Sequence, residues 1–510
     1  MKKIYLSTDG KTLKRVTKNC KGEVVVPDGV EVIGKRAFAG LEEVTSVILP
    51  SSVKDLGEEA FEGCSALTCI VLPEGVEVIP KRAFADCHEL AAVSLPSTLK
   101  TIEKEAFAHC TNLNRIEIPD SVGTIGAKAF SYCKSLAEVV MPASLIELGE
   151  KSFYTCSSLK VVDIPEGVEA IPEACFEDCK DLTAAIFHDG LKTIAKYAFR
   201  FCSIKFIEIS STVETINEEA FRGNKAIGIQ LGASVCSLAQ DVFWDNAPIS
   251  ITVDKRNMTY TDDGCNVIME VDSCKVIRGT ASSSIPETAT VIGYGAFQDI
   301  PQVLVVPSSV AVIETAAFFN CQEGSIVILQ EGVSIIKWGA FQQQNGQNIT
   351  VYIPSTTRRI DGQYSSVEFR LDAANPYYNY DADGHNIISK DGVLVWGHLI
   401  KGIPTEGVNR VEVVNYGKVP YSELTVPDNV KYISYDICRL LTRFDGLKTL
   451  KLSKGTIMSM PGDWKTNCEI TVTIPRKKSA SGISKNTEYI IPRGSSWFEI
   501  YDFLGNDSIV

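Results

Sequence analysis

The stretch LPEGVEVIPKRAFADC, Leu72–Cys87, recurs with variations along the first half of the chain. Its Ala-Phe pair sets a period of 23 residues from Phe38 to Phe199, followed by two intervals of 22 that end at Phe243. A proline marks the same 23-residue period independently, from Pro27 to Pro165. Repetition at a fixed period of this size indicates a solenoid built from one repeated supersecondary unit.

Two patterns follow each other within one copy. The apolar residues of segment 67–72 fit a short strand, and Pro73 ends it because proline cannot donate to a continuing ladder. The apolar residues of segment 79–87 fall at i, i+4, i+5 and i+8, which predicts one face of a short helical turn. Each copy is therefore expected to be one coil of strand, turn, short helical piece and return.

A single coil of this kind is not stable by itself. Ordering its 23 residues costs roughly 35 kcal/mol at ~1.5 kcal/mol per residue. An apolar side chain contributes ~1.5–3 kcal/mol only when it is fully buried, and a lone coil leaves both flat sides in water. The sequence therefore predicts an α/β solenoid in which coils stack. We expect a right-handed coil with a parallel β-sheet on the concave face, short helical or 3-10 turns on the convex side, and β-hairpin insertions.

A cysteine follows most of these phenylalanines by three residues, at what we call the corner position. The corner cysteines expected to form a structural ladder are Cys64, Cys87, Cys110, Cys133, Cys156, Cys179, Cys202 and Cys321. A small buried thiol that bonds neighbouring backbone is the favoured interpretation. Zinc binding and disulfides remain alternatives, although a linear column does not suit four tetrahedral ligands. Asn224 and Asn246 replace cysteine at this position, as expected where the side chain bonds backbone.

The full pattern L-x-x-I-x-L-P-x-x-V-x-x-I-x-x-x-A-F-x-x-C is present as Leu90…Pro96…Ile102…Ala106-Phe107…Cys110. It resembles the BspA-like leucine-rich repeat family over most of residues 23–475. The resemblance implies a leucine-rich-repeat solenoid with its sheet on one face. Members of that family are known mainly as surface proteins of host-associated bacteria and protists, and several bind host matrix or plasma proteins.

Breaks in the repeat suggest the domain organisation. Asp263-Gly264 and Asp383-Gly384 lie between apolar segments, which is a hairpin signal. The predicted segments are an N-terminal capping hairpin (1–22), a regular array (23–250), a β-hairpin insertion (251–285), a second array (286–366), a second hairpin insertion (367–404), degenerate repeats (405–475) and a C-terminal cap (476–510).

Composition narrows the classes of partner. The net charge is −13, from 50 Lys+Arg against 63 Asp+Glu, and such acidity argues against nucleic acid and anionic lipid. No run approaches the roughly 18 apolar residues of a membrane span, so no membrane insertion is expected. Without a visible secretory signal, the sequence as it stands predicts a cytoplasmic location, or the cell surface if an export signal has been removed.

The sequence offers no assembled catalytic set. His88 and His109 flank corner cysteines, and Cys175 with Cys179 forms an i, i+4 pair, so a thiol-dependent enzyme or metal site is conceivable. Surface histidines beside inward-facing thiols explain the same pattern more simply. No phosphate loop or metalloprotease motif is present, and no cofactor or metal is predicted.

What remains is the outward surface of the strands, because positions 2, 3 and 5 of L-x-x-I-x-L should point away from the core. The candidate binding residues on this concave face are Asn114, Arg115, Glu117, Glu138, Lys160, Asp163, Lys205, Phe206 and Glu208. A rigid sheet suits protein recognition because little ordering entropy is lost on binding. Alternatively, these charges only solubilise the surface and pair across strands.

The predicted function is therefore a non-enzymatic protein-binding solenoid, monomeric or weakly self-associating, used in recognition such as host-protein adhesion by a bacterial protein. An intracellular scaffold or assembly protein is the alternative. A thiol-dependent enzyme is the second alternative.

Overall fold

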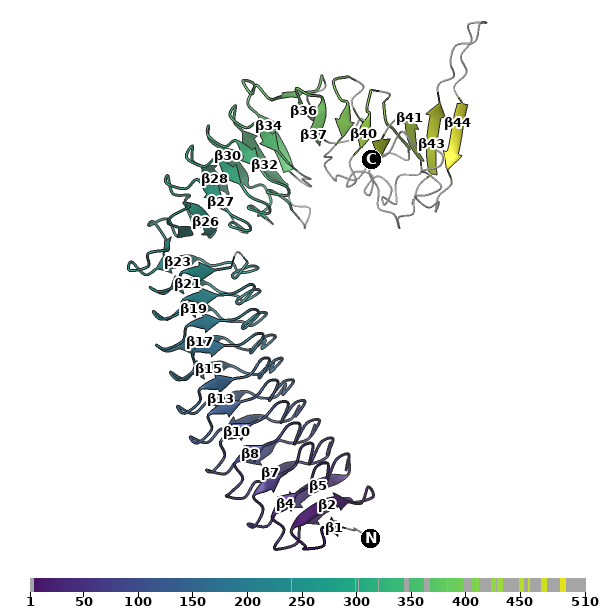
Figure 1. Ribbon diagram of the computed structural model, residues 1–510. Coiled ribbons are helices and arrows are strands. Elements are labelled where there is room, and N and C mark those ends of the chain that lie inside the picture. Colours follow the sequence, from purple (N-terminus) through teal and green to yellow (C-terminus); the bar gives the residue numbers. More distant parts are fainter. Residues whose placement is uncertain are drawn as a thin grey trace. The chain divides into compact units, whose positions relative to one another are not determined.

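The computed structural model describes residues 4–239, 241–298, 300, 302–319, 321–343, 348–361, 367–382, 384, 386–397, 403, 406–411, 423–427, 429–433, 449–453, 457–458, 469–474 and 487–491 (Figure 1). Across these residues there are strands and turns but no helix, and hence no helix able to cross a membrane. The chain forms two compact units. Unit 1 is Met1–Asp272 with Ile277–Ser282, and unit 2 is Ser273–Val276 with Ser283–Val510.

Each regular coil of unit 1 contributes two strands, so the coils stack through two columns of parallel strands rather than the single sheet that was expected. The first column is β3 (Gly22–Val25), β5 (Val44–Ile48), β7 (Cys69–Val71), β9 (Ala92–Ser94), β11 (Arg115–Glu117), β13 (Glu138–Val140), β15 (Val161–Ile164), β17 (Ala184–Phe187), β19 (Phe206–Glu208), β21 (Gly228–Leu231) and β23 (Ser250–Val253). The second is β4 (Val32–Ile33), β6 (Asp55–Leu56), β8 (Val78–Ile79), β10 (Thr101–Ile102), β12 (Thr124–Ile125), β14 (Glu147–Leu148), β16 (Ala170–Ile171), β18 (Thr193–Ile194), β20 (Thr215–Ile216) and β22 (Ser237–Leu238).

The strands pair in the same register from coil to coil. In the second column Ile79, Ile102, Ile125 and Leu148 are successive partners, and in the first column Arg115 pairs with Glu138. Partners are therefore one repeat apart, and every side chain lies against its counterpart in the next coil. This arrangement confirms the stacked, parallel-stranded solenoid that the period predicts.

The predicted helical turns are wrong. Segment 80–87 forms consecutive turns, because Arg82 (φ 55°) and Asp86 (φ 62°) adopt the left-handed conformation, which interrupts a right-handed helix. The backbone N–H groups then alternate between two kinds of acceptor. Ala83 and Ala85 donate within the coil to Pro80 and Arg82, whereas Arg82, Phe84 and Asp86 donate to carbonyl oxygens of the next coil. These turns thus stack the coils as the strands do.

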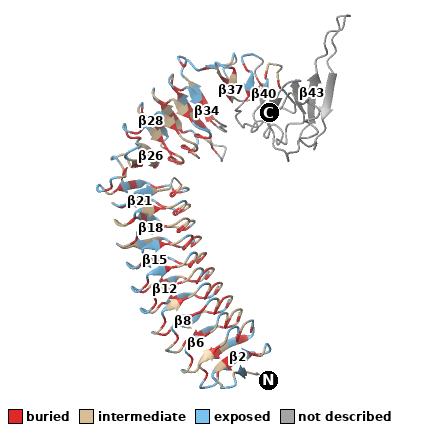
Figure 2. Ribbon diagram, viewed as in Figure 1, coloured by how far each residue is buried: buried red, intermediate tan, exposed pale blue. Residues whose placement is uncertain are grey.

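The core runs along the coil axis as a column of phenylalanine rings. From Phe38–Phe61 to Phe199–Phe221, adjacent ring centroids lie 4.8 to 5.3 Å apart, with interplanar angles no greater than 19°. These distances are close to the spacing between strands, so the rings stack at the pitch of the coils. Buried residues occupy the interior between the strands and the turns (Figure 2).

Antiparallel hairpins accompany the parallel columns. Antiparallel pairs join β1 (Ile4–Leu6) to β2 (Thr12–Val16), and β24 (Tyr260–Thr261) to β25 (Ile268–Glu270). In unit 2, β36 (Asn386–Ser389) pairs antiparallel with both β35 (Tyr378–Tyr380) and β37 (Val393–Gly397). Two segments assigned to insertions are part of the arrays instead, because β23 and β34 (Val367–Leu371) pair in parallel with the array strands before them.

Unit 2 repeats the two-column arrangement. One column is β28 (Val303–Val306), β30 (Ile326–Leu329), β32 (Ile349–Ile353) and β34. The other is β26 (Lys275–Arg278), through its residues Lys275 and Val276, followed by β27 (Val291–Ile292), β29 (Val312–Ile313), β31 (Ile335–Ile336) and β33 (Arg359–Ile360). Further strands are β38 (Arg410–Val411), β39 (Glu423–Thr425), β40 (Tyr432–Ile433), β41 (Thr449–Ser453), β42 (Ile457–Met458), β43 (Glu469–Ile474) and β44 (Thr487–Ile491). Most of the predicted C-terminal cap, 476–510, lies outside the described residues.

Candidate functional site

The strand face, which we define as the outward side chains of the first strand column in unit 1 and of the residues that directly precede its strands, carries the predicted binding residues. Six of them lie on strands, and Asn114, Lys160 and Lys205 directly precede β11, β15 and β19. Along β11, β13, β15 and β19 the side chains alternate between buried and exposed. Asn114, Arg115, Glu117, Glu138, Lys160, Asp163, Lys205, Phe206 and Glu208 are all exposed. The alternation follows from the two-residue period of a strand, with one face on the core and the other in water.

Three of these residues pair with one another. Arg115 lies 2.7 Å from Glu117 on its own strand and 3.7 Å from Glu138 on the adjacent strand. Over half of each of these side chains remains exposed, so the ion pairs contribute little to stability. This cluster fits the alternative in which surface charges pair across strands, and it leaves Arg115 less available to a partner.

The other charged residues of the strand face are arranged differently. Asp163 Oδ1 lies 2.6 Å from Nε2 of His188, so this carboxylate already has one hydrogen-bond partner within the protein. Within the described part of the chain, Lys160, Lys205 and Glu208 form no ion pair. The ammonium groups of Lys160 and Lys205 are therefore open to a carboxylate from a partner molecule.

Phe206 is a large aromatic side chain of the strand face, with 57% of its surface exposed. Its strand neighbour is Gly228 on β21, and a Cβ atom added to Gly228 would lie 3.0 Å from the Phe206 ring. The glycine thus provides the space over which the ring lies, while Ala184 and Phe206 both line a groove at the ends of the strands. A rigid exposed aromatic ring among small residues has the character of a binding anchor.

A groove of about 470 Å³ runs along the ends of β17, β19, β21 and β23, where Phe206 and Glu208 line it. It forms where the repeat loses its strand-ending proline, because Ser210, Gly232 and Asp254 occupy successive proline positions. Gly232 is required there, since a Cβ atom would lie 2.2 Å from the Ser210 carbonyl oxygen. This groove was not predicted from the sequence, although the loss of proline from the repeat position after Pro165 was a visible signal.

Asp254 and Arg256 close one end of the groove. Hydrogen bonds from the Arg256 side chain and backbone lower the pKa of Asp254 to about 2, so the carboxylate stays ionised. In unit 2 a comparable groove of about 580 Å³ lies along β30, β32 and β34, lined by Tyr352 and Arg370. Both arrays therefore present a hollow at the ends of their last strands.

The corner cysteines lie beneath this surface, in the core. In unit 1 all seven are buried, and each Sγ donates to the carbonyl oxygen of a phenylalanine one coil back, at 3.1 to 3.2 Å. Cys321 in unit 2 is also buried, but its thiol donates to Phe318 in its own coil at 3.2 Å. These contacts agree with the interpretation of a small residue that bonds neighbouring backbone.

The same burial makes these thiols poor nucleophiles. Burial raises the pKa of Cys64 to about 12 and also raises the pKa values of Cys87 and Cys110, so the thiols stay protonated near neutral pH. The flanking histidines, His88 and His109, make contacts with other groups. His88 Nδ1 lies 3.0 Å from the His109 carbonyl oxygen, and the His109 ring stacks on Tyr132.

Asparagine takes the corner position where the preceding coil is one residue shorter. In a full-length coil the Leu182 N–H donates to the Cys179 carbonyl oxygen, but the 22-residue coil lacks that turn. Its Ile204 N–H donates instead to Asn224 Oδ1 at 3.0 Å, while Asn224 Nδ2 donates to the Phe199 and Phe221 carbonyl oxygens. Asn246 repeats this arrangement with Ala226.

Comparison with known proteins agrees with this architecture. No curated protein matches the chain. The solved structures include a leucine-rich repeat protein from Bacteroides ovatus with 22% sequence identity and a TM-score of 0.52, which covers 73% of this chain and 98% of its own. A leucine-rich repeat protein from T. pallidum is 32% identical over 36% of this chain and 78% of its own, with a TM-score of 0.27. A leucine rich cell surface protein from Faecalibacterium prausnitzii is 20% identical over 73% of this chain and 94% of its own, with a TM-score of 0.34.

The first of these likenesses supports the solenoid fold. The family assignment depends on a direct match to the BspA type leucine rich repeat region in six copies, over residues 16–136, 100–228 and 275–366. Together these ranges cover more than half of the chain, and they contain the corner cysteines and the stacked phenylalanines described above. The resemblance expected from the repeat pattern is confirmed, and the chain belongs to the BspA-type leucine-rich repeat family.

Proposed function

We propose that this chain is a non-enzymatic recognition protein that binds a protein partner through the strand face, with Phe206 as the central anchor. The observation that carries the proposal is the exposure of the Phe206 ring on a rigid sheet, beside a groove of about 470 Å³. Aromatic anchors at the centre of an interface contribute a large share of binding energy.

The charges around the ring suggest the chemistry of the partner. Lys160 and Lys205 are exposed, and within the described part of the chain neither forms an ion pair. A partner segment that places an apolar side chain against Phe206 and carboxylates near these lysines would complement the surface. The family resemblance suggests a host matrix or plasma protein as this partner, and adhesion is therefore part of the proposal.

The test compares variants for binding to immobilised matrix and plasma proteins, measured by biolayer interferometry on the full chain. Phe206→Ala should weaken binding about 30-fold, the effect of a hot-spot loss of about 2 kcal/mol. Lys160→Glu with Lys205→Glu should weaken binding further and reduce its dependence on salt. Far-UV circular dichroism establishes that each variant keeps its fold.

Phe201→Ala is the matched control, because Phe201 is the same residue type, is 43% exposed and lies among the turns rather than the strands. Its binding should stay within about twofold of the original protein. Equal affinity of Phe206→Ala and the original protein for a bound partner would remove the strand face from consideration.

A further inference from the structure

The side of the coil opposite the strands carries a ladder of ion pairs. Arg36 pairs with Glu59 and with Glu62 at 2.9 Å, and Arg82 pairs with Glu62 at 2.8 Å and with Glu105 at 2.7 Å. Several coils further on the ladder resumes. Its members there are Glu177, Arg200, Glu219, Arg222 and Asp245, with the measured Arg200–Glu219 and Arg222–Asp245 contacts at 3.0 and 3.3 Å.

The alternation of charge fails between these two stretches. Lys128 and Lys151 occupy the position that Arg82 and Glu105 hold in earlier coils, so two ammonium groups follow each other without an intervening acid. Within the described part of the chain Lys128 forms no ion pair, and Lys151 contacts only its sequence neighbour Glu150, at 3.2 Å. The two lysines are therefore adjacent cations, with Glu105 near Lys128, and Glu173 and Glu177 near Lys151.

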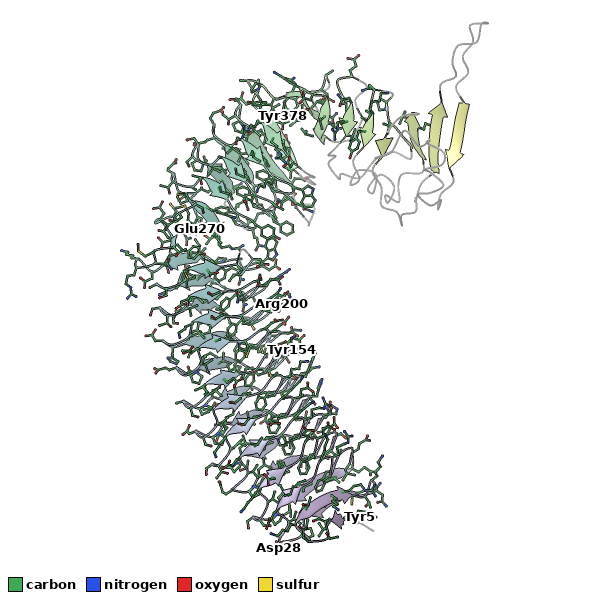
Figure 3. The ribbon with its side chains drawn as sticks, in the orientation of Figure 1. Tyr5, Asp28, Tyr154, Arg200, Glu270 and Tyr378 are labelled. Carbon is green, nitrogen blue, oxygen red and sulfur yellow. The ribbon has the colours of Figure 1, made fainter. Side chains whose placement is uncertain are left out.

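Three aromatic rings accompany the two lysines. His109 stacks on Tyr132 with ring centroids 4.6 Å apart, and Tyr154 meets Tyr132 edge-on at 5.3 Å. Tyr154 lies on the same edge of unit 1 as Arg200, which belongs to the resumed ladder (Figure 3). Rings and lysines together line a groove of about 370 Å³, to which Ser131 and Glu105 also contribute.

The backbone around the groove limits what it can recognise. The N–H groups of Lys128, Tyr132 and Lys151 all donate to carbonyl oxygens of the next coil. An extended peptide would need free backbone groups to add to this surface, so recognition must come from side chains. Glu105, at the edge of the groove, and the net charge of −13 disfavour a polyanion such as nucleic acid.

From this combination we propose that the groove binds an acidic monosaccharide unit, a sugar ring that carries a sulfate or carboxylate group. The ring surface that the His109–Tyr132 stack leaves open would pack against the apolar face of the sugar, and Lys128 and Lys151 would hold its anionic group. The hydroxyl groups of Ser131 and Tyr132 suit the remaining sugar hydroxyls, and so does the carboxylate of Glu105, which Arg82 holds in place at 2.7 Å. The volume falls within the range of small-ligand pockets.

The test is isothermal titration calorimetry on the full chain with N-acetylglucosamine 6-sulfate, glucuronic acid, neutral N-acetylglucosamine and adenosine monophosphate. We expect saturable binding of an acidic sugar, with the neutral sugar at least tenfold weaker. Lys128→Gln with Lys151→Gln should weaken binding at least tenfold, and so should Tyr132→Leu. Because Tyr132→Leu alters packing, Tyr132→Phe serves as a second ring variant and should retain binding within about fivefold.

Lys134→Gln is the matched control, since Lys134 is an exposed lysine two residues from Tyr132 that does not line the groove, and its affinity should be unchanged. Phe206→Ala should also leave sugar binding unchanged, which separates this site from the strand face. Absence of saturable binding of either acidic sugar, binding unaffected by the double lysine change, or tighter binding of adenosine monophosphate than of both acidic sugars would overturn the proposal.

Discussion

Restoring the family's cysteine at position 224 should destabilise this protein. Asn224 is almost fully buried and holds three backbone groups, namely the Ile204 N–H and the carbonyl oxygens of Phe199 and Phe221. A cysteine at this position could donate to one carbonyl only. Asn224→Cys therefore removes two hydrogen bonds and leaves the buried Ile204 N–H without an acceptor.

The magnitude follows from these losses. A lost hydrogen bond costs about 1 kcal/mol net, and a buried donor left unsatisfied costs about 1–3 kcal/mol. We expect a total loss of about 2–4 kcal/mol in the free energy of unfolding of the affected coils. Since 1.4 kcal/mol corresponds to a factor of ten, amide exchange around Ile204 should accelerate by about 100-fold.

Hydrogen–deuterium exchange with mass spectrometry on peptides spanning 199–226 measures this change, and urea denaturation followed by circular dichroism gives the accompanying loss of stability. The reciprocal change Cys202→Asn is the control. The coil before Cys202 has its full length, and the Leu182 N–H already donates to the Cys179 carbonyl oxygen. The side-chain oxygen of an asparagine at position 202 would therefore have no N–H to accept from, and the larger side chain would overpack the corner, so Cys202→Asn should not gain stability. Stability of Asn224→Cys equal to or above that of the original protein would refute the reasoning.

Other predictions concern the corner thiols and the stacking of the coils. In Cys133→Ala, loss of the thiol that donates to Phe107 at 3.1 Å should cost about 1–2 kcal/mol by urea denaturation, and a cost below about 0.5 kcal/mol would contradict the role given to the thiol. Gly149→Ala should lower the free energy of unfolding by about 3 kcal/mol, because the new Cβ would lie 2.2 Å from the Ala127 nitrogen. In Gly123→Ala the nearest atom would be 3.9 Å from the new Cβ, so the free energy of unfolding should change by less than about 0.5 kcal/mol. Burial raises the pKa of several corner thiols above their unfolded value near ~8.5, so their contribution to stability is complete below that pH and falls as pH rises toward about 12 for Cys64. The urea midpoint should therefore drop between about pH 8 and 9.5, before most tyrosines ionise, and an unchanged midpoint would count against the buried thiols as its cause.

The period made the solenoid predictable, because stacked coils require the same flat sides in every copy. The helical turns were mispredicted for a local reason. Arg82 and Asp86 are left-handed in the structure, and arginine gives no sign of that conformation in a sequence. Glycine at positions 40 and 63, equivalent to Asp86, did give that sign, since glycine favours a positive φ.

The exposure of the candidate binding residues was predictable, but their contacts were not. Strand alternation places Phe206 outward, and Lys160 and Lys205, which directly precede their strands, are exposed as the repeat pattern predicts. The pairing of Arg115 with Glu138 depends on which rotamers meet across strands, which alternation does not specify. The groove beside Lys128 and Tyr132 depends on residues from several coils, and it becomes visible only when the repeats are compared position by position.

The contacts between coils have a direction. Each corner thiol in unit 1 reaches back to the coil before it, whereas the backbone amides of Arg82, Phe84 and Asp86 reach forward to the coil after it. Since these contacts span about one repeat, insertion or removal of a whole coil would recreate every contact in kind, whereas a partial coil would break all of them at once. The family's geometry thus permits growth in steps of 23 residues, each advancing the binding surface by roughly one strand spacing of ~4.8 Å. Evolution could in this way match the span of the surface to a partner without redesigning the core.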